Sequence, residues 1–400
     1  MNSQDLGVGN GRYFGSVRPS EHAVRFVAPD DEGIESTVAA GLLARIPETQ
    51  SRFQPLPAPT GSAPYRLPLS SLLAADHMQR IVDAKKLVFH AVGDTGGSVN
   101  DTFQREVGRL MELDFRRPSV ADIPSFFFHL GDVVYFKGEA ANYYPQFYDA
   151  YEFYRAPIVA IPGNHDAEVN PGLRPLDAFV RNFCSPSPVH SPDALHIRRH
   201  TMTQPNVYFT LETPLATIVG LCSNVPEGGV IEQNQLDWFI GELRHAPTDR
   251  ALIVAVHHPL FSADTSHSGS PVINAVFEQA ISASDRVPDL VLHGHVHNYQ
   301  RFTWHVRGRE VPVIVAGAGG YRNLHHVGRP QGIPLRTPYR VEGVPAVLES
   351  YTDDRHGFLR LEVTAQRITG KYYAIPLAGG DRADRMDLFH LDLATHRLGD

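Results

Sequence analysis

The chain has 400 residues, 42% of them apolar and 20% charged, which is typical of a globular protein with one large domain or two smaller ones. Its net charge of −8 provides no overall positive field for a polyanion, so we expect no nucleic-acid partner. The chain has only two cysteines, Cys184 and Cys222, which excludes a disulfide framework and a thiolate metal cage.

The N-terminal stretch MNSQDLGVGNGRYFG shows no targeting signal. It has neither a basic region nor an apolar run, and no segment of the chain reaches the roughly 18 apolar residues of a membrane span. We therefore predict a cytoplasmic protein with no membrane partner. These features do not predict the oligomeric state.

Residues 1–85 are predicted to form a proline-rich N-terminal extension that packs on or covers the main domain. Six prolines between Pro47 and Pro68 prevent a continuous helix or a central strand in that stretch. Near the end of the extension, residues 69–86 have apolar positions at helical spacing, which favours a helix packed on the main domain.

Residues 86–400 are predicted to form the main domain, which begins with buried strands alternating with helices. Short apolar runs at residues 87–92, 125–130 and 157–161 alternate with amphipathic stretches, as in βαβ units. The same reasoning predicts helices at residues 233–246 and 271–282. Further strands are expected at residues 206–213, 215–222, 251–256 and 290–294.

The C-terminal part of the main domain is predicted to consist of strands without intervening helices. These strands are expected at residues 303–308, 311–317, 357–364 and 371–376. Strands that follow one another in this way are joined by hairpins and meanders. We therefore expect an α/β protein in which two packed sheets are flanked by helices.

Five polar clusters each follow a predicted buried strand. In chain order they are GDTG at residues 93–96, GDVVY at 131–135, GNHD at 163–166, VAVHH at 254–258 and GHVH at 294–297. Each cluster alone is weak evidence, because Gly-Asp usually marks a turn and a single histidine after a strand is usually packed. Ligands of open α/β sheets bind outside the carboxyl ends of the strands, so we expect the clusters to converge on one site.

The ordered set of clusters resembles, motif for motif, the signature blocks of the purple acid phosphatases in the calcineurin-like metallophosphoesterase superfamily. The resemblance spans residues 86–301 and includes the sequence NYQR at residues 298–301. It implies a four-layer α/β/β/α sandwich of two mixed sheets flanked by helices. Large eukaryotic members carry a fibronectin-like domain ahead of the catalytic one, which the proline-broken residues 1–85 are too poor in strands to supply.

The resemblance also implies a dinuclear metal centre in which Asp132 bridges the two metals. It places the first metal on Asp94, Asp132, Tyr135 and His297. It places the second metal on Asp132, Asn164, His257 and His295. Carboxylate, amide, phenolate and imidazole groups are hard or borderline ligands that suit iron, manganese or zinc.

Gly96 and Tyr135 indicate the subclass and the metals. Most calcineurin-like enzymes have Asp-x-His in the first block, where this chain has Gly96, and Tyr135 stands where purple acid phosphatases carry a tyrosinate. A phenol with a pKa of about 10 binds a metal near neutral pH only beside a strong Lewis acid. We therefore predict Fe(III) beside a divalent ion (Fe, Zn or Mn). The alternative is that Tyr135 only packs among neighbouring tyrosines.

Residues next to the ligands are candidates for catalysis and substrate binding. Two adjacent metals generate a bridging hydroxide for in-line attack on phosphorus. His165 is the first candidate for the general acid, with Asp166 orienting it, and His165 and Asn164 are expected to contact substrate. His267 lies ten positions beyond His257, where the resemblance places a second substrate-facing histidine. The alternative for His267 is a surface loop histidine.

The leading hypothesis is hydrolysis of phosphate monoesters on a small phosphorylated substrate. A first alternative is hydrolysis of phosphodiesters such as cyclic nucleotides at the same site, because a dinuclear centre can act on either ester. A second alternative is a non-catalytic scaffold on the same fold. The complete ligand set disfavours the scaffold. The substrate, the pH optimum and the identity of the divalent metal are not predicted by the sequence.

Overall fold

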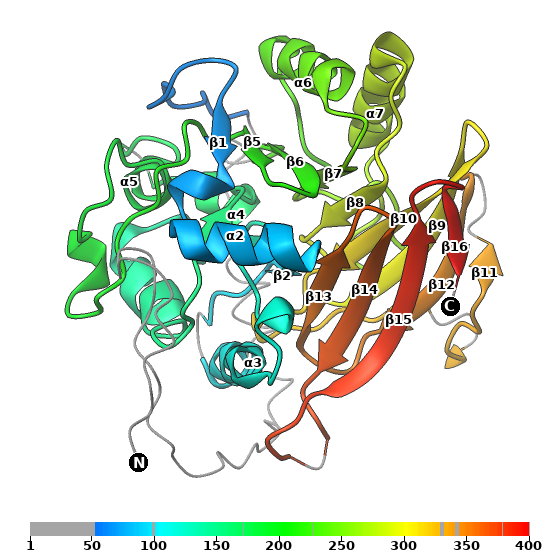
Figure 1. Cartoon of the computed structure of the whole chain (residues 1–400). Helices are drawn as coiled ribbons and strands as arrows, with labels where there is room; N and C mark the ends of the chain where they lie inside the picture. The colour runs from blue at the N-terminus through cyan, green and yellow to red at the C-terminus, as the bar shows by residue number, and fades with distance from the viewer. Residues whose placement is uncertain are drawn as a thin grey trace.

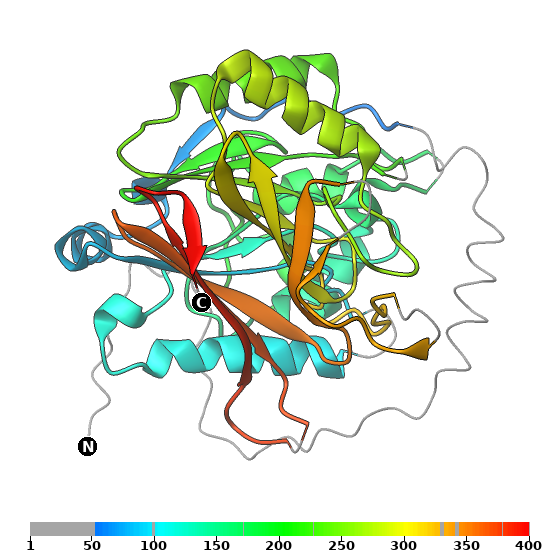
Figure 2. The same cartoon turned by 90° about the vertical axis from the view of Figure 1, so that its right-hand side faces the viewer.

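Two mixed β-sheets pack face to face, and helices cover their outer sides (Figures 1 and 2). The computed structural model describes residues 53–97, 101–170, 172–226, 228–328, 332–340, 344–377 and 379–399. In Figure 2, α6 (Gln233–His245) and α7 (Pro271–Ser284) lie along one side and α3 (Thr102–Glu112) along the other, with the sheets between them. The predicted four-layer α/β/β/α sandwich is therefore confirmed.

The smaller sheet has seven strands and contains the first three βα units of the predicted domain. Its spatial order is β16 (Arg397–Gly399), β15 (Asp384–Asp392), β14 (Arg367–Ala374), β13 (Gly357–Val363), β2 (Leu87–Val92), β3 (Phe127–His129) and β4 (Ile158–Ala160). Strands β2, β3 and β4 are parallel, whereas the pairs from β2 to β16 are antiparallel. All residues of β2 are buried, which explains its continuous apolar run.

The larger sheet has nine strands. Its spatial order is β1 (Arg66–Pro68), β5 (Phe209–Glu212), β6 (Ala216–Leu221), β7 (Ala251–Val256), β8 (Leu290–His293), β10 (Arg309–Ala316), β9 (Tyr299–Val306), β12 (Ala346–Thr352) and β11 (Tyr339–Arg340). Strands β6, β7, β8 and β10 are mutually parallel. The predicted strand pair at residues 206–222 forms the antiparallel pair β5–β6.

The remaining helices are short and lie mostly in the connections between strands. The α-helices are α2 (Ala75–Ala84), α4 (Asn164–Ala167) and α5 (Asp177–Phe183). The 3₁₀ turns are η1 (Leu69–Ser71), η2 (Leu113–Arg116), η3 (Val120–Asp122), η4 (Ala140–Asn142) and η6 (Pro192–Ala194), and η5 (Tyr144–Tyr148) is a π-helical turn. Within the described ranges, no helix has the length and apolarity needed to cross a bilayer.

Part of the predicted N-terminal extension belongs to the larger sheet. Residues 1–52 lie outside the described residues. The edge strand β1 pairs with β5, and α2 forms inside the stretch for which a helix was predicted. Strand β1 was not predicted from the sequence, because a three-residue edge strand that contains Pro68 has no alternating pattern.

Two apolar clusters hold the layers together. One lies between the sheets and under α3, and includes Phe89, Phe128 and Met111. The other fills the space between the nine-stranded sheet and helices α6 and α7, where Phe239 and Phe277 meet edge to face. This packing fixes the two sheets so that the carboxyl ends of β2, β3, β4, β7 and β8 reach one edge of the sandwich.

Candidate metal centre

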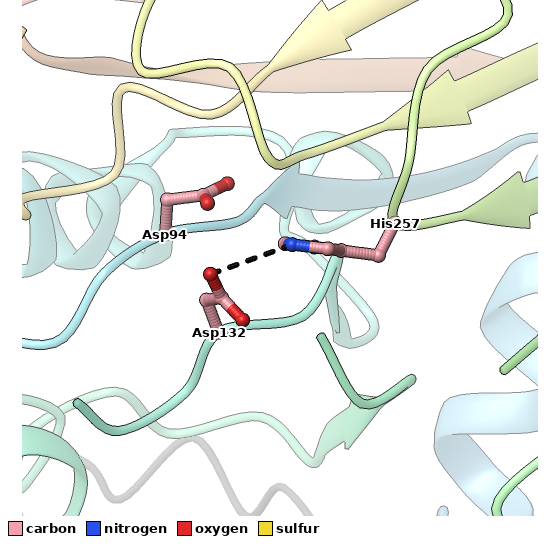
Figure 3. Close-up of side chains that lie close together, drawn as sticks. All are labelled: Asp94, Asp132 and His257. Atoms are coloured by element: carbon pink, nitrogen blue, oxygen red, sulfur yellow. Dashed lines mark ion pairs between the residues drawn. The ribbon is translucent and has the colours of Figure 1, made fainter. Parts of the chain in front are cut away.

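The loops that follow β2, β3 and β7 bring three predicted metal ligands together. Figure 3 shows Asp94, Asp132 and His257 pointing toward one another from these separate loops. One potential ligand atom from each residue lies within 4.8 Å of the other two. Nε2 of His257 is 3.4 Å from Oδ2 of Asp132, and all three side chains are buried. Three of the five strand-end clusters therefore converge, as predicted from their positions along the chain.

Glycines in the motifs let the loops approach one another closely. A Cβ atom on Gly163 would lie 2.0 Å from Oδ1 of Asp132, and one on Gly131 would lie 2.5 Å from Nδ1 of His257. Asp94, Asp132 and His295 themselves have positive φ angles of 57°, 53° and 67°. Non-glycine residues rarely adopt this region, and such backbone strain concentrates at functional sites.

The hydroxyl of Tyr135 points at the predicted ligands of the first metal. It lies 3.2 Å from Oδ2 of Asp132, 3.4 Å from Oδ1 of Asp94 and 3.4 Å from Nε2 of His297. The amide side chain of Gln146 fixes this tyrosine, since it accepts the Tyr135 N–H at 2.8 Å and donates to the Tyr135 carbonyl at 3.1 Å. The phenol oxygen is thus held where a ligand of the first metal would be.

The predicted ligands of the second metal surround the side-chain oxygen of Asn164. This oxygen is 3.1 Å from Nε2 of His257 and 3.1 Å from Nδ1 of His295. The other ring nitrogen of His257 lies 2.8 Å from the Leu130 carbonyl, which fixes the orientation of the ring.

Backbone contacts orient the two histidines of the GHVH motif. The His295 N–H donates to Oδ2 of Asp94 at 2.8 Å. Nδ1 of His297 lies 2.8 Å from the Asn323 carbonyl, so its Nε2 faces Oδ1 of Asp94 at 3.6 Å. The seven predicted metal ligands therefore lie together in one group of contacting side chains. They are Asp94, Asp132, Tyr135, Asn164, His257, His295 and His297.

The electrostatics of the group favour a bound cation. Burial, with the nearby Asp132 carboxylate, raises the pKa of Asp94 well above its usual value, despite the opposing effect of His257. Burial and both carboxylates also raise the pKa of the Tyr135 phenol. Burial lowers the pKa of His257, but Asp132 and Asp94 outweigh this and raise it to about 9. A metal cation stabilises the deprotonated forms of the buried Asp94 carboxyl and Tyr135 phenol. The donor set therefore fits a bound metal ion.

His165 lies beside the metal centre. Its backbone N–H donates to Oδ1 of Asp132 at 2.9 Å, and its ring centroid is 4.6 Å from that of Tyr135. Nδ1 of the ring lies 2.9 Å from the Phe136 carbonyl, so this carbonyl occupies the orienting place that we predicted for Asp166. Nε2 is therefore left for a substrate or a water molecule.

Asp166 joins two motif loops through backbone hydrogen bonds. Its carboxylate accepts the N–H groups of Val133 at 3.0 Å, Val134 at 3.2 Å and Gly163 at 2.9 Å. The side chain is 1% exposed, and burial with the nearby Asp132 raises its pKa to about 7. These contacts give Asp166 a structural role in holding the GDVVY loop against the GNHD loop.

His267 reaches the metal centre from the loop after β7. Its ring centroid lies 4.6 Å from that of His295 and 6.5 Å from that of His297. The loop therefore brings this histidine next to two predicted ligands. The sequence had left open whether His267 is a surface loop histidine instead.

Two further residues of the site, Tyr321 and His325, were not identified from the sequence. The Tyr321 ring stacks on Tyr135 with centroids 4.0 Å apart, and the His325 ring lies 4.4 Å from that of His297. Both follow β10, which is parallel to β8 and ends at the same edge. The available signal was the glycine-rich turn GAGG directly after a buried strand, a position equivalent to those of the five motifs.

Two mixed sheets with carboxylate, amide and imidazole groups at the ends of their parallel strands define an α/β protein with a candidate metal site. The chain belongs to the calcineurin-like phosphoesterase family, because its residues 87–299, more than half of the chain, match the model of that family. Membership in this family implies a dimetal centre and indicates a hydrolase that acts on phosphoric ester bonds. A search of curated proteins gave no match.

Three solved structures are similar to this fold. A purple acid phosphatase from yellow lupin (Lupinus luteus) seeds matches with a TM-score of 0.54 and 15% identity, over 77% of this chain and 54% of that chain. GAP50 of Plasmodium matches with a TM-score of 0.50 and 14% identity, over 76% and 89% of the two chains. PhoD also has a TM-score of 0.50 and 14% identity, over 86% and 73%. Identities this low show the fold alone, and the match spans about half of the lupin protein.

Proposed function

We propose that this protein hydrolyses phosphate monoesters at a centre that holds two metal ions. The observation that carries the proposal is the convergence of Asp94, Asp132 and His257, whose ligand atoms lie within 4.8 Å of one another. Oxygens of Tyr135 and Asn164 adjoin this group on either side. The lupin structure is a purple acid phosphatase, which supports the same class of reaction.

The first metal would be held by Asp94, Asp132, Tyr135 and His297. The second would be held by Asp132, Asn164, His257 and His295. Bound metal ions would acidify water and neutralise the charge that develops on the phosphoryl oxygens. We propose Fe(III) next to the phenol, since burial and two carboxylates raise the pKa of Tyr135, and a strong Lewis acid favours the phenolate over the phenol.

The protein's own side chains would bind the ester and transfer a proton. His165 lies next to Asn164 with Nδ1 fixed by the Phe136 carbonyl, so its Nε2 can donate a proton to the leaving oxygen. Asn164 and His267 would contact the phosphate group of the substrate. The surrounding ligands are buried, which limits the competition of bulk water with these contacts. We propose that the substrate is a small phosphorylated molecule. The cytoplasmic location stays a prediction.

The proposed reaction is tested by comparing turnover of p-nitrophenyl phosphate with turnover of bis-p-nitrophenyl phosphate by metal-loaded protein. We expect the monoester to be preferred, and Asp132→Asn to remove both the metals and the activity. A preference for the diester would instead establish the phosphodiesterase alternative.

The visible spectrum tests the metal assignment separately from the reaction. A phenolate bound to Fe(III) gives a purple charge-transfer band, which Tyr135→Phe should abolish because the coordinating oxygen is gone. A colourless wild-type protein with full iron occupancy would contradict the assignment of Tyr135 as a ligand.

A scaffold function is the remaining candidate. It is favoured by the likeness to GAP50, which is described as the anchor in the inner membrane complex of Plasmodium. Metal analysis separates the two functions, because a scaffold needs no metals. Wild-type protein that binds no metals and hydrolyses no ester would support the scaffold.

A further inference from the structure

His325 lies on the loop that follows β10 and contacts two histidines of the site. Its ring centroid is 4.4 Å from that of the predicted ligand His297 and 4.9 Å from that of His267. Its backbone is fixed as well, since the His325 N–H donates to the His297 carbonyl at 3.0 Å. The His325 carbonyl accepts from the side-chain amide of Asn298 at 2.9 Å. Both backbone groups of His325 thus tie its loop to His297 and to the residue that follows it.

A buried carboxylate, Asp264, joins the loop of His267 to the loop of His325. Its side chain is 0% exposed. Oδ1 accepts the backbone N–H groups of Ser266 at 2.6 Å and His267 at 2.8 Å, and Oδ2 accepts from the Asn298 amide at 3.0 Å. A single carboxylate therefore sets the position of His267 and is anchored to the residue that follows a predicted ligand.

The same carboxylate faces the ring of His325. Oδ1 of Asp264 is 3.7 Å from Nδ1 of His325, a distance at which a carboxylate attracts an imidazole N–H without forming a direct hydrogen bond. Nδ1 of His325 is thus the ring nitrogen that faces Asp264. A carboxylate behind an imidazole is a common means of orienting the ring toward a ligand.

We propose that His325 is a further substrate-contacting residue, and that Asp264 is a positioning residue that aims His325 and His267 at the same phosphate group. The inference rests on the proposed phosphoesterase function. Two adjacent imidazoles offer N–H donors to phosphoryl oxygens, which are strong acceptors of charge-assisted hydrogen bonds.

The test measures binding of inorganic phosphate to metal-loaded protein by calorimetry, together with kcat and KM for p-nitrophenyl phosphate. His325→Gln should weaken phosphate binding and raise KM by about tenfold, the usual order for a lost charge-assisted hydrogen bond, while the metal content is unchanged. The matched control is His326→Gln. The His326 side chain is 57% exposed and lies 3.5 Å from Asp353, so we expect less than a twofold change.

Asp264→Asn tests the positioning role. It keeps an oxygen for the backbone N–H groups of Ser266 and His267, removes the charge that faces His325, and replaces the oxygen that accepts the Asn298 amide with an NH2 group. We expect weaker phosphate binding than in the wild type. We also expect the double variant Asp264→Asn/His325→Gln to lose less affinity than the two single losses combined, because both act through the same ring.

The results separate this inference from the proposed function. Wild-type protein that is fully metallated but neither binds phosphate nor hydrolyses an ester would overturn both. Wild-type activity with unchanged phosphate affinity in His325→Gln would overturn the inference alone. Loss of metals from His325→Gln would also overturn it, since His325 would then support His297 rather than contact substrate.

Discussion

Gly96 and Tyr135 compete for the same space beside the predicted first metal. A Cβ atom on Gly96 would lie 2.8 Å from Cδ2 of Tyr135 and 2.5 Å from Oε1 of Gln146, which holds Tyr135 in place. The histidine that most family members carry at this position therefore does not fit together with the tyrosine. The absence of a histidine ligand at position 96 and the presence of Tyr135 are therefore structurally coupled.

The first prediction follows from this contact. Gly96→Ala should displace Tyr135 or Gln146, and we expect metal affinity to fall at least about tenfold, since a displaced ligand support typically costs that much. Metal content after dialysis measures the effect. The control is Gly241→Ala in α6, where a Cβ atom meets nothing within 4 Å. Equal metal content in both variants would contradict the predicted clash.

The second prediction concerns metal removal. Chelation should lower the melting temperature, because ions that bind only the folded state stabilise it by about 2.7 kcal/mol at a hundredfold excess over Kd. Asp132→Asn should abolish this dependence on metal, since Asp132 is the predicted bridge between both ions. Thermal melts with and without chelator provide the measurement. A wild-type melting temperature that is the same with and without chelator would show that the metals do not stabilise the fold.

The third prediction concerns pH. In the metal-free protein Asp132 and Asp94 outweigh burial and raise the pKa of His257 to about 9, so this imidazole is protonated at pH 7. A ligand imidazole must be neutral, and metal binding therefore releases its proton. Deprotonation of His257 should raise the metal affinity by about tenfold per pH unit between pH 7 and 9. Above pH 9 the metal affinity should no longer change because of this group.

Calorimetric titrations in buffers of different ionisation enthalpy count the released protons. The stability of the metal-free fold changes with pH in the opposite direction to the metal affinity. A raised histidine pKa stabilises the metal-free fold below pH 6.5, the ordinary value, and that stabilisation disappears as the pH rises through about 9. Metal affinity that does not change between pH 7 and 9 would contradict a protonated His257.

The fourth prediction concerns a buried ion pair outside the candidate metal centre. Asp114 accepts from Arg360 at 2.5 Å, His90 at 3.0 Å and Arg117 at 2.7 Å, and the Arg360 side chain is 1% exposed. Asp114→Ala should lower the free energy of unfolding by about 3 kcal/mol, because the buried Arg360 guanidinium loses one of its two carboxylate partners and keeps only Glu362. Urea unfolding measures this change.

The control for Asp114 is Asp249→Ala, whose pair with Arg250 involves an aspartate that is 72% exposed, and we expect little change there. Burial raises the pKa of Asp114, but His90, Arg360 and Arg117 outweigh burial and lower it below its ordinary value. Its stabilisation is thus present above about pH 3.8 and is lost at more acidic pH. A wild-type protein and an Asp114→Ala variant of equal stability at pH 7 would disprove the role of this pair.

Much of the fold was predictable because buried strands leave continuous apolar runs. The runs at residues 87–92, 251–256 and 290–294 became β2, β7 and β8. Strands β12 and β15 were not identified because each mixes buried and partly exposed positions on the outer part of a sheet. Their sequences lack a strict alternation, and pairing with neighbouring strands determines their conformation.

The sequence by itself determined the family resemblance, the order of the strand-end motifs and the types of ligand that they carry. The tertiary structure supplied the distances in this site, since the packing of two sheets joins residues as far apart in the chain as Asp94 and His257. It also placed Tyr321 on Tyr135, His325 beside His267 and the carboxylate of Asp166 under two loops. Loop contacts of this kind have no periodic pattern, because the scaffold and not the local sequence fixes where each loop ends.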